Sequence, residues 1–250
     1  YSHQWAKELN NTIEIRTQDF TDYNNVLFTE SLQWMYFTGG EPLIVNEYWE
    51  TLERLIAQGV SKNISLRYNT NLSTLKYKDK NIFDIWNQFK NVELVFSIDA
   101  VGEPLSYIRS GSDWLRIKAN LEEVITHNVD VCISPVVSVL NIWFLADLLR
   151  YAQSVGLTVK PVILSGPDFL GLGVIPDSLK DHALNTVTEI EKLKVLSQSD
   201  INHIRALIVN NDSQGLLPHT IAHILYLDRV RNENLFDLLP FDTVAKDIIV

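Results

Sequence analysis

The chain has 250 residues, of which 46% are hydrophobic and 21% charged, and this composition excludes an intrinsically disordered protein. The formal net charge is −10, so phosphate backbones repel the chain on average and nucleic acid is not expected as a partner. Cys132 is the only cysteine, which excludes a disulfide framework within the chain.

The sequence predicts neither a signal peptide nor a membrane span. No basic stretch followed by an apolar one opens the sequence, so we expect no signal peptide. No run reaches the roughly 18 to 20 apolar residues that a membrane span needs, so no membrane partner is expected. Together with the single cysteine, these features predict a cytoplasmic protein.

Five runs rich in β-branched, aliphatic or aromatic residues have the character of strands. Each is short and almost continuously apolar, which favours parallel strands covered on both faces over an antiparallel sheet with one wet face. In chain order the expected strands are Gln33–Thr38, Asn63–Tyr68, Val92–Ile98, Val129–Val137 and Leu157–Leu164.

The segments between these strands have apolar residues at helical spacing. Ser112 is placed to cap the third helix, and the fourth begins at Asn141 and ends at Gly156. The four expected helices are Glu47–Gln58, Asn81–Phe89, Asp113–Thr126 and Asn141–Ser154. Strand centres recur about every 30 residues, which is typical of βα units in barrels or doubly wound sheets.

The pattern changes after the fifth strand. Ser165–Asp177 is rich in Gly and Pro and is expected to be a loop. Three helices are then expected, over Asp177–Leu193, Ser199–Asn211 and Pro218–Asn232, with no strand among them. We therefore divide the chain into an α/β core over residues 1–165 and a loop plus helical C-terminal extension over residues 166–250, packed on the core.

In parallel α/β folds, ligands bind at the loops that follow the carboxyl ends of the strands. Gly39, Gly40, Glu41 and Pro42 follow the first expected strand. The two glycines let the backbone approach a ligand, Glu41 adds a fixed negative charge, and Pro42 stiffens the turn. Such a loop is suited to accept hydrogen bonds from an ammonium group, although a plain tight turn is the alternative.

Polar residues follow the next strands as well. Asn69 and Asn71 suit ligand hydroxyl groups, or else form a turn. Ser97 and Asp99 alternate with apolar residues and point to one side, where they bind a ligand or satisfy the local backbone.

Two more candidates come later in the core. Arg109 can pair with a carboxylate through two hydrogen bonds, or be a surface charge. Ser134 lies beside Pro135, and the kink there can place backbone groups against a flat ring, or Ser134 is simply packed in the core.

These loops resemble those of the radical S-adenosylmethionine superfamily. Gly39–Pro42 is similar to the family's GGEP motif, which binds the methionine ammonium. Ser97–Asp99 resembles the motif that contacts ribose and carboxylate, and Asn69–Asn71 resembles a polar motif on the preceding strand. Ser134–Val136 falls where the family contacts adenine.

The likeness extends from about Trp5 to Pro240 and is closest to the subgroup that carries a twitch domain. Its further similar strings are Leu66–Asn71, Tyr107–Arg109 and Arg229–Asn234. The resemblance implies a partial (β/α) barrel of the radical S-adenosylmethionine type, of which this chain supplies about five parallel strands and lacks the first.

The resemblance also implies cofactors and partners. The intact enzyme would bind S-adenosylmethionine and a [4Fe–4S] cluster, and would generate a 5′-deoxyadenosyl radical that abstracts hydrogen from an unknown substrate, such as a peptide or a metabolite. The family also implies a reductant such as flavodoxin or ferredoxin. In these assignments Ser97 and Arg109 hold the cofactor's carboxylate, and Asn69 and Asp99 meet its ribose.

The departure from the family lies in the cluster ligands. The family binds its cluster through CxxxCxxC, whereas Cys132 is alone and is expected to be a small buried hydrophobe. We expect that the chain begins just after that loop, with Ser2–Leu9 as the following helix, and that it is inactive by itself. His219 and His223 share a helix face but have no further ligands nearby, so no metal ligand is expected here.

Two other functions stay open. A barrel hydrolase or lyase could use Glu41 and Asp99 as paired carboxylates, but it would need more strands than five. Alternatively, a homologue without a cluster binds only a nucleoside or a partner protein.

Overall fold

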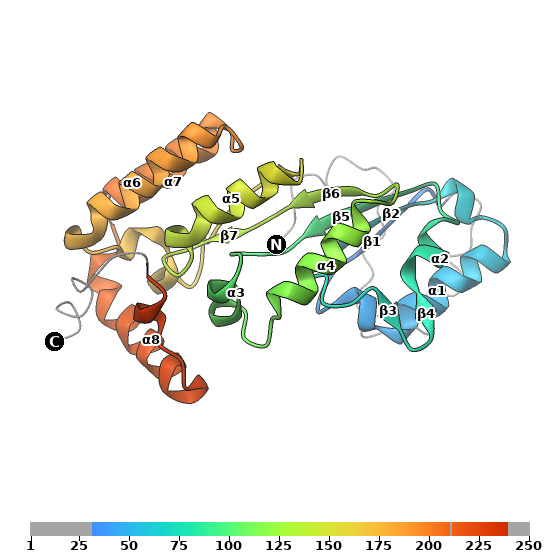
Figure 1. Cartoon of the computed structure of the whole chain (residues 1–250), viewed down its shortest axis with the longest axis horizontal. Helices are drawn as coiled ribbons and strands as arrows, with labels where there is room; N and C mark the ends of the chain where they lie inside the picture. Colours follow the sequence, from blue (N-terminus) through green and yellow to red (C-terminus); the bar gives the residue numbers. More distant parts are fainter. Residues whose placement is uncertain (1–31, 211, 240–250) are drawn as a thin grey trace.

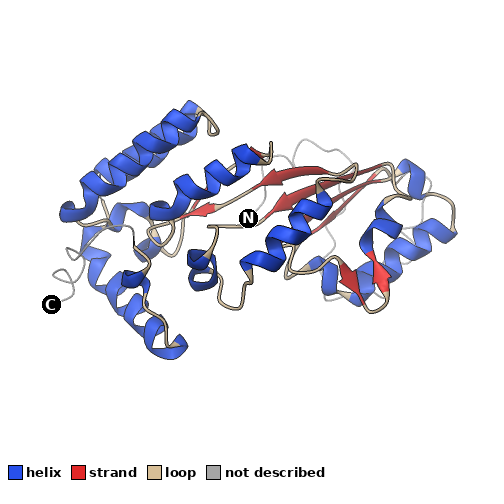
Figure 2. Cartoon of the chain, in the orientation of Figure 1, coloured by secondary structure: helices blue, strands red, loops and turns tan. Residues whose placement is uncertain are grey.

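The computed structural model describes residues 32–210 and 212–239, which form an α/β fold (Figure 2). Five parallel strands make one sheet in the order β1-β2-β5-β6-β8, so spatial order follows chain order. The strands are β1 Trp34–Phe37, β2 Ser65–Thr70, β5 Asn91–Phe96, β6 Asp130–Ile133 and β8 Thr158–Val159. The expected five-stranded parallel sheet is confirmed, while the helix expected over Ser2–Leu9 lies outside the described residues.

The two faces of the sheet are buried to different degrees in the described part of the chain. In β2 and β5, buried and half-buried residues alternate strictly. Leu66 and Tyr68 point into the core, whereas Arg67 and Asn69 lie on the other, half-exposed face. Because polar residues recur on alternate positions of these strands, we call this second side the open face.

Five helices follow or connect the strands, and their buried side chains join those of the sheet in one core. They are α1 Asn46–Ala57, α2 Ile82–Trp86, α3 Glu103–Ile108, α4 Trp114–Val124 and α5 Leu145–Ser154. Short 3₁₀ turns are η3 Pro42–Ile44, η4 Ser61–Asn63 and η5 Ile142–Phe144. In Figure 1, α1 and α2 lie at one end of the elongated molecule, with the sheet between them and the last three helices.

Prolines interrupt the last two strands at matching positions. Beyond Pro135 and Pro161 the chain forms a second parallel pair, β7 Val136–Val137 and β9 Val162–Ile163. The expected strands over 129–137 and 157–164 are therefore each broken, because proline has no N–H to donate to a ladder. One bond still crosses at the break, from Val162 N to Pro135 O at 2.8 Å.

Local signals were misassigned at two helix starts. Asp113, not Ser112, caps α4, because its carboxylate accepts from Arg116 N at 3.2 Å. Asn141 makes no cap bond for η5, since its side chain bonds elsewhere. By contrast, Gly156 follows α5 with φ +71°, as expected of a glycine beyond a helix end.

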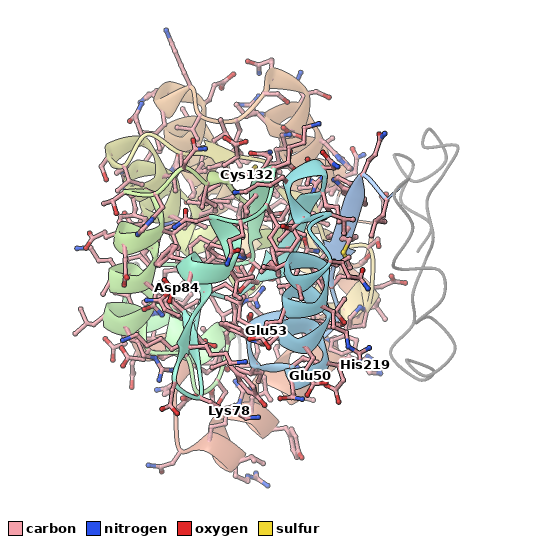
Figure 3. All side chains as sticks on the ribbon, turned by 90° about the vertical axis from the view of Figure 1, so that its right-hand side faces the viewer. Glu50, Glu53, Lys78, Asp84, Cys132 and His219 are labelled. Carbon is pink, nitrogen blue, oxygen red and sulfur yellow. The ribbon has the colours of Figure 1, made fainter. Side chains whose placement is uncertain are left out.

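A short hairpin and helix α3 were not expected from the pattern. The hairpin pairs β3 Lys76–Tyr77 with β4 Lys80–Asn81 in antiparallel fashion. Figure 3 shows Lys78 of this hairpin near Glu50 and Glu53 of α1. Lys80 forms an ion pair with Glu53, and Lys78 Nζ donates to Asn46 Oδ1 at 2.9 Å. Strands of two residues are too short to give a readable alternation.

The rest of the described chain, after β9, contains helices and turns but no strand. The expected loop holds η6 Asp168–Leu170 and η7 Leu172–Val174, and then come α6 Asp177–Leu193, α7 Gln198–Asn210, η8 Gln214–Leu216, α8 Leu217–Arg231 and η9 Leu235–Asp237. Arg150 of α5 pairs with Glu189 of α6 at 3.0 Å, which joins this region to the core. Within the described ranges, no helix is long and apolar enough for a membrane span.

Candidate functional site

The loop after β1 has the backbone that its glycines allow. Gly39 has φ +121°, a region that L-residues rarely adopt, and both Gly39 and Gly40 are exposed. Pro42 is buried and begins η3, while Glu41 caps that turn by accepting from Leu43 N at 3.1 Å. The loop is therefore a shaped turn with an accessible backbone at the carboxyl end of β1.

The carboxylate of Glu41 ties this loop to the end of β2. Its Oε1 accepts from Thr70 Oγ1 at 2.7 Å, and its Oε2 accepts from the backbone N–H of Asn71 at 2.8 Å. The side chain of Asn71 in turn accepts from Ser73 N at 2.8 Å and forms a local turn. Glu41 therefore already has hydrogen-bond donors on both oxygens.

Asp99 and Arg109 form an ion pair near the ends of β5 and β6. Asp99 is only 6% exposed, and its Oδ2 accepts from Arg109 Nε at 2.7 Å. Its Oδ1 accepts from the backbone N–H of Val136, also at 2.7 Å. Among the described contacts, the terminal nitrogens of Arg109 have no hydrogen-bond partner, and the side chain is 31% exposed. Arg109 is thus oriented by a buried carboxylate and keeps its outer edge accessible.

Asn141 is a buried residue that joins two loops, and not the helix cap that its position predicts. It is fully buried, and its Nδ2 donates to Asp99 O at 3.0 Å and Val136 O at 2.9 Å. Its Oδ1 accepts from Ser138 N at 2.7 Å. An Asn inside a long apolar run is a usable signal for such a clamp, because a buried amide needs partners.

A cavity of about 580 Å³ lies over the open face of the sheet. Of the ten predicted site residues, Asn69 and Ser134 line it. The Oδ1 of Asn69 is buried and has no hydrogen-bond partner within residues 32–210 and 212–239. The other described lining residues are Tyr36, Arg67, Glu93, Leu94, Val95, Asp130, Val131, Cys132, Thr158, Lys160, Pro161 and Val162.

Cys132 also corrects an expectation, because it is half-buried at this cavity and not a core residue. Strand alternation explains the difference, since Ile133 takes the core side and its two neighbours take the open face. Figure 3 labels Cys132 in a view that looks along the strands from their amino ends.

The remaining predicted residues are not part of the lining of this cavity. Gly39, Gly40, Glu41, Pro42 and Asn71 form the cluster that links β1 to β2. Ser97 is half-buried, and its backbone N–H donates to Thr70 O at 2.9 Å, so it lies between that cluster and the Asp99–Arg109 pair. The described part of the chain holds no group of three metal-ligating side chains, and His223 packs against the ring of Phe169.

No protein-family model matches this sequence, and no curated protein matches it either. The assignment of a function therefore depends on the residues and their geometry.

Proposed function

We propose that this chain binds S-adenosylmethionine at the carboxyl edge of its sheet, as part of a radical S-adenosylmethionine enzyme with a partial (β/α) barrel. One observation carries the proposal: Asn69 Oδ1 is a buried acceptor with no donor among the described residues, and Asn69 lines a cavity of about 580 Å³. A buried polar atom left unpaired costs about 1–3 kcal/mol. If the Asn69 amide turns its oxygen into the cavity, a ligand hydroxyl or N–H removes that cost, and ribose hydroxyls are such donors.

The amino-acid part of the cofactor fits the neighbouring groups. Arg109 is held at Nε by Asp99, so its terminal nitrogens can bind the methionine carboxylate in two-point fashion. The accessible backbone of Gly39 and Gly40 accepts from the ammonium. Glu41 adds negative charge behind this loop, because its oxygens already accept hydrogen bonds within the chain.

The other predicted residues have supporting parts in this proposal. Ser97 lies between the two clusters and Ser134 lines the cavity where the nucleoside would lie. Pro42 and Asn71 shape the turns that carry the contacting groups.

The iron–sulfur cluster is a separate matter. The sequence has one cysteine, so its residues do not fit a site that needs three thiolates. The cluster supplies the electron for radical formation in this family, and its ligands would have to come from outside this sequence. We therefore propose for this chain the binding and orientation of S-adenosylmethionine, and not the binding of the cluster.

Calorimetric titration of the full chain with S-adenosylmethionine tests the proposal. We expect saturable binding at one site, weakened about five- to tenfold in Asn69→Ala, because one buried hydrogen bond is lost. Asn128→Ala is the matched control, since Asn128 is exposed before β6. A folded chain that gives no binding at millimolar cofactor would overturn the proposal.

The same titration with adenosine addresses the binding-module alternative. If adenosine binds as tightly as S-adenosylmethionine, the contacts to the amino-acid part contribute nothing, and a nucleoside-binding module is favoured. The paired-carboxylate hydrolase has less support, because Glu41 and Asp99 each accept hydrogen bonds on both oxygens within the chain. A general acid or base needs a carboxylate oxygen that faces the substrate, whereas each oxygen of these two side chains faces a donor within the chain.

A further inference from the structure

The end of α8 contacts α3 across a long stretch of sequence. Arg231 Nη1 donates to the backbone carbonyl of Tyr107 at 2.8 Å, although the two residues are 124 positions apart. The guanidinium also lies 6.0 Å from the centroid of the Tyr107 ring. This carbonyl belongs to the last turn of α3, where carbonyls lack partners within the helix and a nearby cation is favourable.

The turn that follows α8 lies next to Tyr107. Asn232 has φ +54° and reverses the chain, so that Glu233 N donates to Asp228 O at 3.0 Å. Burial raises the pKa of Tyr107, and contact with Asp228 and the charge of Glu233 raise it further, whereas Arg231 lowers it. The tyrosine is thus held neutral among the charged groups of this turn.

Arg109 lies two residues after Tyr107 and caps the C-terminal end of the same short helix. Its backbone N–H donates to Leu105 O at 2.8 Å, and its Nε donates to Asp99. Helix α3 has six residues, and so short a helix depends on outside contacts for its stability. Two such contacts bracket its last turn: Asp99 from the end of β5, and Arg231 from the end of α8.

We propose that Arg231 is a positioning residue for the cofactor site: by holding the last turn of α3, it fixes the direction in which Arg109 presents its terminal nitrogens. The inference rests on the proposed binding of S-adenosylmethionine, and it gives the helical C-terminal region a part in the affinity of a site that it does not touch. Arg231 acts through the backbone of α3 and makes no contact with the ligand.

The test compares Arg231→Met with Arg229→Met. Both changes remove one arginine from the last turn of α8, but Arg229 is exposed and has no described ion pair. Calorimetry is expected to give about tenfold weaker binding of S-adenosylmethionine in Arg231→Met and no change in Arg229→Met. Equal affinity in the two variants would overturn the proposal.

A double-mutant cycle separates positioning from general loss of stability. If Arg231 acts through Arg109, adding Arg231→Met to an Arg109→Met chain leaves the affinity unchanged. Additive losses in the double variant would instead mean that Arg231 acts elsewhere. Arg231→Lys keeps a cation near the Tyr107 carbonyl, so it is expected to retain most of the affinity, and a loss as large as in Arg231→Met contradicts the idea.

Hydrogen exchange of the ligand-free chain gives a readout that does not need the cofactor. The amides of residues 105–109 are expected to exchange faster in Arg231→Met than in Arg229→Met, while those of α1 stay the same. If the unmodified chain fails to bind S-adenosylmethionine, the proposed function fails, yet this exchange still tests the contact. Equal exchange rates in both variants would mean that Arg231 does not stabilise the last turn of α3.

Discussion

The carboxylate of Asp99 accepts the backbone N–H of Val136 at 2.7 Å, so a side chain takes over where the ladder between β5 and β6 ends. The last backbone bond of that ladder runs from Ser134 N to Phe96 O at 2.8 Å. Beyond it, Pro135 interrupts the strand, and the N–H of Val136 would otherwise lack a strand acceptor. Asp99, which orients Arg109, therefore also completes the hydrogen bonding at the carboxyl end of the sheet.

Replacing Asp99 is expected to destabilise the fold as well as the site. Asp99→Ala leaves the Val136 N–H and the Arg109 guanidinium unpaired, which should lower the free energy of unfolding by about 3 kcal/mol. Asp99→Asn keeps an acceptor for Val136 and should cost about half as much. Urea denaturation measures both, with the exposed Asp181 of α6 as control, where alanine should change the value by less than about 0.5 kcal/mol. A loss in Asp99→Ala no larger than this would contradict the network.

The loop after β1 offers two glycines with different backbone requirements. Gly39 has φ +121°, so Gly39→Ala should lower the free energy of unfolding by about 1–2 kcal/mol. Gly40 lies outside that region, and an added Cβ there meets no atom within 4 Å, so Gly40→Ala should be nearly neutral. Thermal unfolding of the two variants makes the comparison, and equal midpoints would mean that the loop has another conformation.

Stability is expected to fall at high pH because of buried tyrosines. Burial, and then the charge of Glu122, raise the pKa of Tyr151 to about 12, and burial also raises the pKa of Tyr68. An unfolded tyrosine ionises near pH 10, so the stabilisation is fully present below about pH 10 and is lost as the pH rises through about 12. Tyr151→Phe should lose less stability over this window than the unmodified chain.

Denaturant midpoints at intervals between pH 8 and pH 12 check this expectation. Tyr226→Phe is the control, because Tyr226 is 62% exposed on α8. If Tyr151→Phe and Tyr226→Phe follow the same curve, burial of Tyr151 does not contribute to the alkaline loss.

Cys132 reports on the cavity directly, because the sequence has no other cysteine. Its half-buried thiol should react with a small alkylating agent more slowly than a free thiol but at a measurable rate in the folded state. S-adenosylmethionine at saturation should slow the reaction at least about fivefold, since both occupy one cavity. Mass spectrometry follows the labelling, and an unchanged rate at saturation would place the ligand elsewhere.

The sheet was predictable because its signal is strong and local. Five apolar runs at a βα spacing predict five parallel strands, and the residues after β1, β2 and β5 could be recognised as polar loops. The breaks at Pro135 and Pro161 were readable in principle, since proline cannot donate, but the apolar residues around them hide the interruption.

The contacts within the site were less predictable because they join distant segments. Neither the bond from Thr70 to Glu41 nor that from Asn141 to Asp99 follows from a local pattern, since each depends on which loops the sheet brings together. The same applies to Cys132, whose apolar neighbours indicate a core while strand alternation turns it to the open face. Helix α3 was missed because six residues are too few for a helical period to be visible.

Pro161, between β8 and β9 at the border of the described sheet, also affects how the protein behaves at high concentration. The N–H groups of Lys160, Val162 and Leu164 all donate inward, to backbone carbonyls of β6, of β7 and of the residues between them. Alternation then turns position 161 outward, where a proline has no hydrogen to offer. An incoming strand from another molecule would find a gap in the row of donors it needs, so this border of the sheet resists edge-to-edge aggregation.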